Sequence, residues 1–489
     1  MGVLSALLLL PLIGAALVAL VPGWGVARVR HAALAVSTGV FLYALWLLGR
    51  FDGASAAIQF AETHTWHARL GSSFSLGVDG FSMPLVVLAT LLMLIAVLAS
   101  TAVRQGARLY FVLLLLLETA MLGVFVARDW SLFYVFWELT LIPLFFLIGR
   151  LGGPERPERQ RAALNFVLYT MGGSVFMLIA ILLLYDVVPS HSFGMQAVAE
   201  AAPALPLPTQ VWIFLGLFIG FAVKMPVFPL HGWLPLAHVE APSPVSILLS
   251  GILLKMGSYG LLRAVETLPG AAWALQGWLA ALAFISILYG GVLAWRQRDL
   301  KAMIAYSSIS HMGVVLLGLA ALNTAGLTGA VYQMVAHGFV AAALFLLVGL
   351  LYERTHTRDI GDYSSLVRTM PRFAFFMVLA LVAGVGLPGT AGFVAELHAL
   401  VGGFARWGAW MLLLSLSLLV GAAYAFRTIG RLFTGPVGDA MQSVPDLTRS
   451  EMAAASVLAA GIIAFGLYPT PALALMGSSV ARLARLFGG

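Results

Sequence analysis

Nine ionisable side chains occur in stretches of the sequence that are otherwise apolar. Two are lysines, three are glutamates and four are histidines, and each of these types can bind and release a proton. Ionisable groups in membrane-like segments usually face a protein interior or a water-filled path, because lipid does not solvate charge. The candidate proton-transfer residues are Lys224, Lys255, Glu118, Glu138, Glu396, His231, His238, His311 and His337.

The lysines are the most informative of the nine. Of the 27 basic side chains only three are lysines, and two of these, Lys224 and Lys255, fall in apolar segments. Arginine keeps its proton in any protein environment, whereas a buried lysine can release it. A purely structural ion pair would accept arginine equally well. The use of lysine at these positions therefore favours proton exchange over a structural role.

The glutamates and histidines each have a structural alternative. A buried carboxylate can cap a broken helix, and for Glu118 in "LLLLLETAMLGVF" this alternative is as good as a functional role, because nothing around it is polar. A single buried histidine is often just packed and hydrogen-bonded. His311 and His337 lie in consecutive apolar segments, however, and favour a relay. A metal site is disfavoured, because the sequence has no His-x-x-x-His pair and no cysteine.

The elements that position these residues are membrane-spanning helices. Hydrophobic residues make up 61% of the 489 residues and charged residues only 10%. The apolar runs reach the length of about 20 residues that a bilayer core requires. No positive residue precedes the first run, which we expect to be a retained span. We predict an all-α polytopic membrane protein with about fourteen transmembrane helices, at 2–21, 31–49, 80–102, 109–127, 130–149, 162–185, 210–230, 244–263, 272–294, 302–322, 327–352, 371–400, 409–432 and 452–475.

The basic residues predict the orientation of these spans. Eighteen of the 27 lie in the odd-numbered loops or near the span ends beside them, seven lie in or beside the even-numbered loops or in the C-terminal tail, and two lie deep inside spans. By the positive-inside rule, the odd loops face the cytoplasm and both termini face the periplasmic side. The net charge of +7 therefore reports topology. We expect no nucleic-acid partner, because no basic patch lies on a soluble face.

Prolines and glycines interrupt two of the spans. Three prolines break the seventh span at 226–235, and "GVGLPGTAGF" at 384–393 breaks the twelfth. Paired broken spans in corresponding halves indicate an inverted-repeat transporter. We therefore predict two inverted five-helix repeats, spans 4–8 and 9–13. The expected division is 1–108 for an N-terminal three-helix region, 109–265 for the first repeat, 266–435 for the second, inverted repeat and 436–489 for a C-terminal helix.

Five stretches between residues 76 and 360 carry a family resemblance. They are "LGVDGFSMPL", "DWSLFYVFWELTLIP", "FAVKMPVFPLHGWLPLAHVEAPSPVSILLSGILLKMGSYGLLR", "DLKAMIAYSSISHMGVVLLG" and "HGFVAAALFLLVGLLYERTHTRDI". The chain resembles the antiporter-like proton-channel subunits of respiratory complex I over almost its whole length. The type with a carboxylate in the twelfth span is the most similar, since its sister types are expected to have lysine where this sequence has Glu396. One departure is Leu236, which stands where the family usually has aspartate.

The resemblance implies a proton-translocating membrane-arm subunit of an NADH:quinone oxidoreductase, driven by quinone reduction elsewhere in the complex. The chain itself would hold no cofactor, and NADH, FMN, iron–sulfur clusters and quinone would belong to partner subunits. Its surroundings would be the inner (cytoplasmic) membrane of a bacterium and antiporter-like membrane-arm subunits on either side. By the same resemblance, Glu138 and Lys224 form an ion pair, Lys255 is the central lysine, Glu396 is the terminal acid, and the four histidines connect them.

Two other classes remain open from the sequence. A Mrp-type cation/proton antiporter subunit or a membrane-hydrogenase relative shares these motifs, although Glu396 in place of lysine counts against the Mrp type. A purely structural membrane scaffold is disfavoured, because a scaffold gains nothing from unpaired buried charges.

Overall fold

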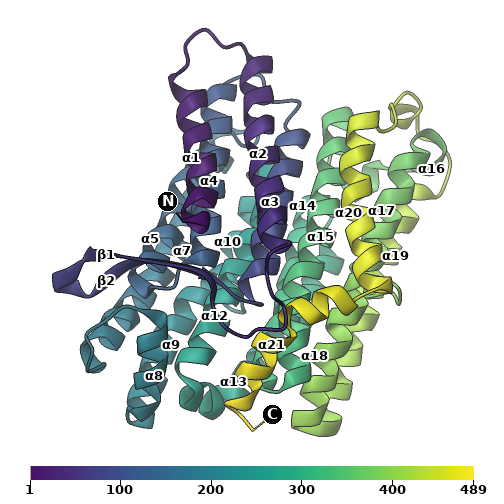
Figure 1. Cartoon of the computed structure of the whole chain (residues 1–489). Coiled ribbons are helices and arrows are strands. Elements are labelled where there is room, and N and C mark those ends of the chain that lie inside the picture. The colour runs from purple at the N-terminus through teal and green to yellow at the C-terminus, as the bar shows by residue number, and fades with distance from the viewer. Residues whose placement is uncertain (1, 489) are drawn as a thin grey trace.

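The apolar runs of the sequence form helices of membrane length. The computed structural model describes residues 2–488. Thirteen helical segments are long and apolar enough to cross a membrane, and Pro371–Ala383 is a shorter apolar helix. This confirms the prediction of a helical polytopic membrane protein with about fourteen spans. The helices (Figure 1) are α1 (Val3–Leu20), α2 (Val26–Leu48), α3 (Ser82–Ala99), α4 (Ala107–Val126), α5 (Trp130–Leu139), α6 (Leu141–Gly149), α7 (Arg156–Val187), α8 (Met195–Ala201), α9 (Leu207–Lys224), α10 (Trp233–Glu240), α11 (Ser243–Leu248), α12 (Leu254–Thr267), α13 (Pro269–Arg296), α14 (Leu300–Ala321), α15 (Thr324–Thr355), α16 (Leu366–Thr369), α17 (Pro371–Ala383), α18 (Ala391–Trp407), α19 (Ser415–Phe433), α20 (Arg449–Leu467) and α21 (Thr470–Arg485).

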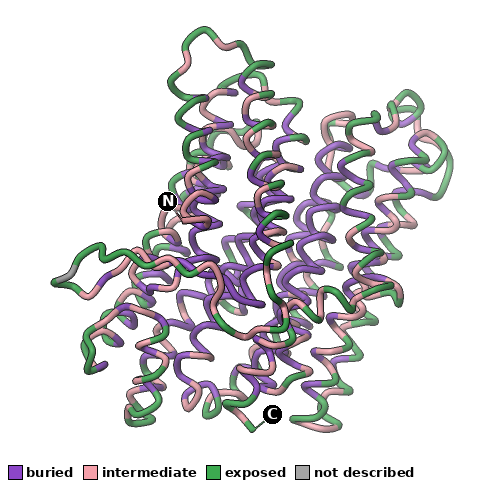
Figure 2. The backbone as a smooth tube through the Cα atoms, viewed as in Figure 1, coloured by how far each residue is buried: buried purple, intermediate pink, exposed green. Residues whose placement is uncertain are grey.

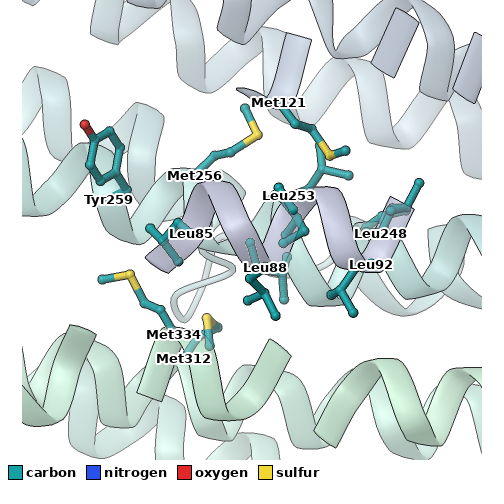
Figure 3. Packing of buried hydrophobic residues seen from close by; sticks show 14 of the residues in the cluster. Leu85, Leu88, Leu92, Met121, Leu248, Leu253, Met256, Tyr259, Met312 and Met334 are labelled. Atoms are coloured by element: carbon teal, nitrogen blue, oxygen red, sulfur yellow. The ribbon is translucent and has the colours of Figure 1, made fainter. Parts of the chain in front are cut away.

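Two spans form the buried interior of the bundle. The most apolar windows of Ser243–Thr267 and of α15 are buried along their whole length. Leucines and methionines from neighbouring helices pack around them, among them Leu88, Met121 and Met312 (Figure 3). The outer helices instead turn apolar side chains outward, and the buried backbone lies mainly in the middle of the molecule (Figure 2). An apolar exterior around a packed interior suits contact with lipid.

The two predicted breaks are present in the structure. The helix α9 ends at Lys224 and α10 begins only at Trp233, while α17 ends at Ala383 and α18 begins at Ala391. Proline cannot donate a backbone hydrogen bond, so each segment needs other partners for its freed backbone groups. In the first break, Phe228 N–H donates to Ser286 Oγ of α13 at 3.0 Å. The first break therefore takes part in the protein's own hydrogen-bonding network.

Two further interruptions were not predicted. The fifth span divides at Thr140 into α5 and α6, and Pro143 follows three residues later, where it removes a helical hydrogen bond to Leu139. In the eighth span, α11 and α12 are joined by a π-turn, η3, at Leu249–Leu253. Such turns are rare and often occur at functional sites. Both interruptions lie within a few residues of candidate proton-transfer side chains.

The all-α prediction missed a β-hairpin between the second and third spans. Strand β1 (Gln59–His67) pairs antiparallel with β2 (Ser72–Val78), and the hairpin projects sideways from the bundle (Figure 1). The loop expected before the seventh span contains the short helix α8, and the C-terminal region contains two helices, α20 and α21, in place of the expected one. The hairpin and α8 lie outside the predicted spans, whereas α21 begins within the span expected at 452–475.

The loops gather at two ends of the bundle, as their predicted alternation requires. Odd-numbered loops line one cleft of about 510 Å³, formed within 99–105, 151–154, 239–244 and 352–358 together with Lys301. At the other end, the connection between α2 and α3 contacts both terminal regions. Leu4 N–H donates to Glu62 Oε1 at 2.6 Å, and Gly80 N–H donates to Ser479 Oγ at 3.0 Å.

A buried ion cluster ties the even-numbered loops to α21. Asp79 is fully buried, and its Oδ2 lies 2.7 Å from Arg263 Nη2 and 3.8 Å from Arg128 Nη1. Arg263 also pairs with Glu266 at 2.8 Å, and Glu266 pairs with Arg482 of α21 at 2.6 Å. Burial alone would raise the pKa of Asp79, but the two guanidinium groups outweigh burial and lower it to about 2.

Replacing Asp79 by asparagine should destabilise the protein by about 3–5 kcal/mol near neutral pH, because the buried Arg263 would lose one of its two carboxylates. Since the folded-state pKa lies below the ordinary value of 3.8, the carboxylate stabilises the fold above that pH and loses this effect as the pH falls towards 2. Thermal unfolding of the two forms should therefore converge in acid. The exposed Asp52, in the same connection, is the matched control, and an equal loss in Asp52→Asn would contradict the assignment.

Candidate functional site

Lys224 lies at the end of α9, where the first predicted break begins. Its side chain is 1% exposed, and Nζ donates to Thr140 Oγ1 at 2.8 Å. The ammonium also lies 3.5 Å from Trp137 O and 4.1 Å from the centroid of the Trp137 ring. The interruption between α5 and α6 at Thr140 thus provides the direct acceptor for this lysine.

The predicted contact between Glu138 and Lys224 is open in this structure. Within residues 2–488 no ion pair joins the two groups, and Glu138 Oε1 is buried without a hydrogen-bond partner. Thr140 Oγ1, two residues after Glu138, accepts the hydrogen bond from Lys224 Nζ in its place. Glu138 is adjacent in sequence to Trp137, whose carbonyl and ring both lie against the ammonium. The two residues are therefore held in the same region, with no direct contact between them.

Lys255 lies at the start of α12, directly after the π-turn, and is fully buried. Leu254 N–H donates to Leu249 O, five residues back, in place of the α-helical acceptor Ser250 O. Ser250 O accepts a hydrogen bond from Lys255 Nζ at 2.5 Å. The second partner of Nζ is His337 Nδ1 at 2.6 Å. The two partners of Lys255 are a backbone carbonyl and an imidazole, both of which can be uncharged. No carboxylate contacts this lysine in the part of the chain that is described.

Three side chains continue from Lys255 to the second break. The rings of His337 on α15 and His311 on α14 have centroids 5.2 Å apart. His311 Nδ1 lies 3.3 Å from Glu396 Oε1 of α18. The structure therefore brings Lys255, His337, His311 and Glu396, predicted from four separate spans, into one row.

Small residues allow the helices of this row to approach closely. A Cβ atom on Gly338, next to His337, would lie 2.5 Å from Leu88 Cδ2 and 3.2 Å from Gly251 O of the π-turn. Gly338 thus permits the close contact between α15 and η3 that the bond between Lys255 and His337 requires.

The second break gives Glu396 its surroundings. Gly386 has a φ of +77°, and a Cβ there would lie 2.6 Å from Glu396 Oε2, so the carboxylate packs against the non-helical backbone. Glu396 and His311 line a cavity of about 40 Å³ together with Tyr424. A polar cavity of this size can hold water.

His231 and His238 lie between the two lysines in the sequence, and no hydrogen bond joins either ring to a lysine among the described residues. His238 is fully buried, stacks on Phe345 at 4.4 Å and has no hydrogen-bond partner at either ring nitrogen. His231 packs against Tyr289, and its Nδ1 also lacks a partner. Water would be needed to join these two histidines to the lysines.

Glu118 is separate from the row. It is fully buried in α4, and neither carboxylate oxygen has a hydrogen-bond partner among the described residues. No contact connects it with the other eight candidates in that part of the chain, so its role stays a prediction.

Lys301 is the functional candidate that the sequence did not reveal. We expected it in a surface loop, but it is 3% exposed and Nζ donates to Ala241 O at 2.8 Å. It is buried because the segment after α10 folds over the start of α14. All three lysines of the chain are therefore buried. The sequence did carry a signal for this, because arginine supplies the positive charge at every other basic position.

A metal centre finds no support in residues 2–488, which contain no group of three or more histidine, cysteine, aspartate or glutamate side chains that could hold an ion.

The comparisons with known proteins agree with the resemblance seen in the sequence. The family model described as "NADH:quinone oxidoreductase/Mrp antiporter, TM" matches residues 127–421, which include both breaks and every candidate except Glu118. NADH-quinone oxidoreductase subunit M of Rhodobacter capsulatus is 40% identical over 505 residues, covering 99% of this chain and 96% of that protein.

The chain belongs to the NADH-quinone oxidoreductase subunit M family. Its structure is similar to a chain of respiratory complex I from Thermus thermophilus with bound NADH, with a TM-score of 0.90, 32% identity and coverage of 99% of this chain and 100% of that one. A chain of the Mrp complex from Dietzia sp. DQ12-45-1b has a TM-score of 0.84 at 24% identity, covering 98% of this chain and 52% of that one. The Mrp protein shares the fold, whereas the subunit M relative shares sequence along nearly the whole chain.

Proposed function

We propose that this chain translocates protons across the membrane along a buried row of lysines, histidines and glutamates. As a member of the subunit M family, it is a membrane-arm subunit of an NADH-quinone oxidoreductase. The observation that supports the path best is the unbroken sequence of contacts from Lys255 through His337 and His311 to Glu396. Each of these groups can accept and release a proton, and the row leads from the π-turn η3 to the break between α17 and α18.

The open contact between Glu138 and Lys224 suggests how transfer is controlled. When the carboxylate lies against Lys224, the ammonium form is favoured, and when it moves away, a buried lysine releases its proton more readily. The proton then passes by water and the intervening histidines to Lys255, and from there to Glu396. These groups interact strongly, so their protonation states belong to the coupled set.

The remaining assignments follow from the same family and are proposals for this chain. NADH, FMN, iron–sulfur clusters and quinone belong to partner subunits, and this chain has no cysteine with which to ligate a cluster. Neighbouring membrane-arm subunits act on the row through Glu138. The odd-numbered loops face the cytoplasm of a bacterium and both termini lie on the periplasmic side. The units 109–265 and 266–435 are inverted repeats, which the corresponding breaks after α9 and α17 support.

Replacing Glu138 by glutamine is the test of this function. The amide cannot carry the charge that acts on Lys224, so proton pumping coupled to quinone reduction should fall by about tenfold or more. The complex should still assemble, because Glu138 Oε1 makes no hydrogen bond that glutamine would break. The measurement is proton uptake into inverted membrane vesicles, relative to the amount of assembled complex.

The exposed Glu200 offers a matched control for the same chemical change. Glu200→Gln should pump at the wild-type rate. Normal pumping by correctly assembled Glu138→Gln membranes would reject the proposed control of Lys224.

A further inference from the structure

The cleft at the end of the odd-numbered loops reaches into the protein as far as the buried Lys301. It has a volume of about 510 Å³, and its walls come from five different loops. Two half-buried acids, Glu240 and Glu353, line it, together with Arg358 and the buried Lys301. Space of this size, lined by several polar groups, accommodates water.

Lys301 lies at the buried base of this cleft without a carboxylate contact. Its Nζ bonds to the neutral Ala241 O, and within the described residues no acid lies within ion-pair distance of it. The neighbouring Asp299 pairs instead with Arg358 at 2.9 Å. Arg358 also donates to Val239 O at 2.7 Å, so the arginine holds the loop together while the lysine remains unpaired.

His238 lies near the segment that Lys301 contacts. It stands two residues before Glu240 on α10, which packs against α14, the helix of Lys301. Lys301 Nζ donates to Ala241 O, three residues after His238. Because both ring nitrogens of His238 lack partners, each is free to bind water on the way between the two lysines.

We propose that Lys301 is the residue through which the row takes up protons from the side of the odd-numbered loops. Glu240 and Glu353 collect protons from solvent in the cleft, and Lys301 passes a proton through water to His238. His238 then gives a proton to Lys255, and Lys301 is reprotonated from the cleft. No bond other than N–H and O–H bonds forms or breaks. This inference rests on the proposed proton path and adds its uptake end.

The test compares Lys301→Arg with Lys301→Gln in membranes that contain the complete complex. Arginine keeps the charge and can still donate to Ala241 O, but it does not release its proton. If Lys301 transfers protons, both variants should lose about tenfold or more of the proton pumping. Arg368→Gln is the matched control: it removes an exposed positive charge from the connection after α15, outside the cleft, and should lose no more than about twofold.

The outcomes separate this inference from the proposed function. Pumping by Lys301→Arg near the wild-type rate, with Lys255→Arg inactive, would overturn the uptake role and leave the row intact. Activity in both arginine variants would reject the row itself. Should neither Lys301 variant assemble, Glu240→Gln decides: pumping reduced severalfold supports the cleft as the uptake site, and unchanged pumping overturns it.

Discussion

Replacing Lys255 by arginine is expected to stop proton translocation almost as completely as replacing it by alanine. The loss in both variants should be about 100-fold. Arginine preserves the positive charge but does not release its proton, so a relay in which residue 255 must release and rebind a proton would stop. The contacts at 2.5 Å to Ser250 O and 2.6 Å to His337 Nδ1 place this lysine where a proton would pass between the two halves of the chain.

The measurement is the number of protons pumped per electron pair in vesicles, for the two variants side by side. Assembly is checked by the amount of the chain in the purified complex. A structural cation would give the opposite pattern, with arginine active and alanine inactive. That pattern would remove Lys255 from the path.

Glu396 should tolerate lysine better than alanine or glutamine. The carboxylate ends the row at His311, next to the cavity of about 40 Å³, and we propose that protons leave from here to the periplasmic side. The position needs a group that loads and releases a proton, and lysine can do this although its charge differs. Glu396→Ala and Glu396→Gln should therefore lose about tenfold or more of the pumping, whereas Glu396→Lys should retain an appreciable part.

Glutamine is the informative member of this series, because it keeps the size and polarity of glutamate but cannot titrate. Equal activity in all three variants would show that Glu396 is not on the path. Loss in the lysine variant alone would show that the negative charge itself matters, through its contact with His311.

The sequence predicted the spans and the two proline breaks because those features depend on local properties. Twenty apolar residues form a membrane helix, and proline breaks it, whatever surrounds them. It also predicted all four members of the row from Lys255 to Glu396, since ionisable side chains in apolar runs are conspicuous. Their order in space required the structure, because four different spans supply them.

Features that depend on contacts between distant segments could not be predicted. Lys301 looks like a loop residue, and only the fold of 239–242 over it makes it buried. The π-turn depends on the packing of η3 against Gly338, and the pair of Asp79 and Arg263 joins residues 184 positions apart. The hairpin strand "QFAETHTWH" alternates only weakly between apolar and polar residues, so its pattern does not indicate a strand.

The turn at Leu249–Leu253 also sets a limit on how this segment can change during evolution. A π-turn accommodates one residue more than a regular α-helix would need over the same stretch. Loss of a single residue there would let the helix become regular, while the turns on either side would keep about the orientation they have now. Lys255 would still face His337, but the carbonyl that now accepts from Lys255 Nζ would be occupied by a regular helical hydrogen bond. In this part of the chain, deletions are therefore expected to be tolerated less often among descendants than substitutions.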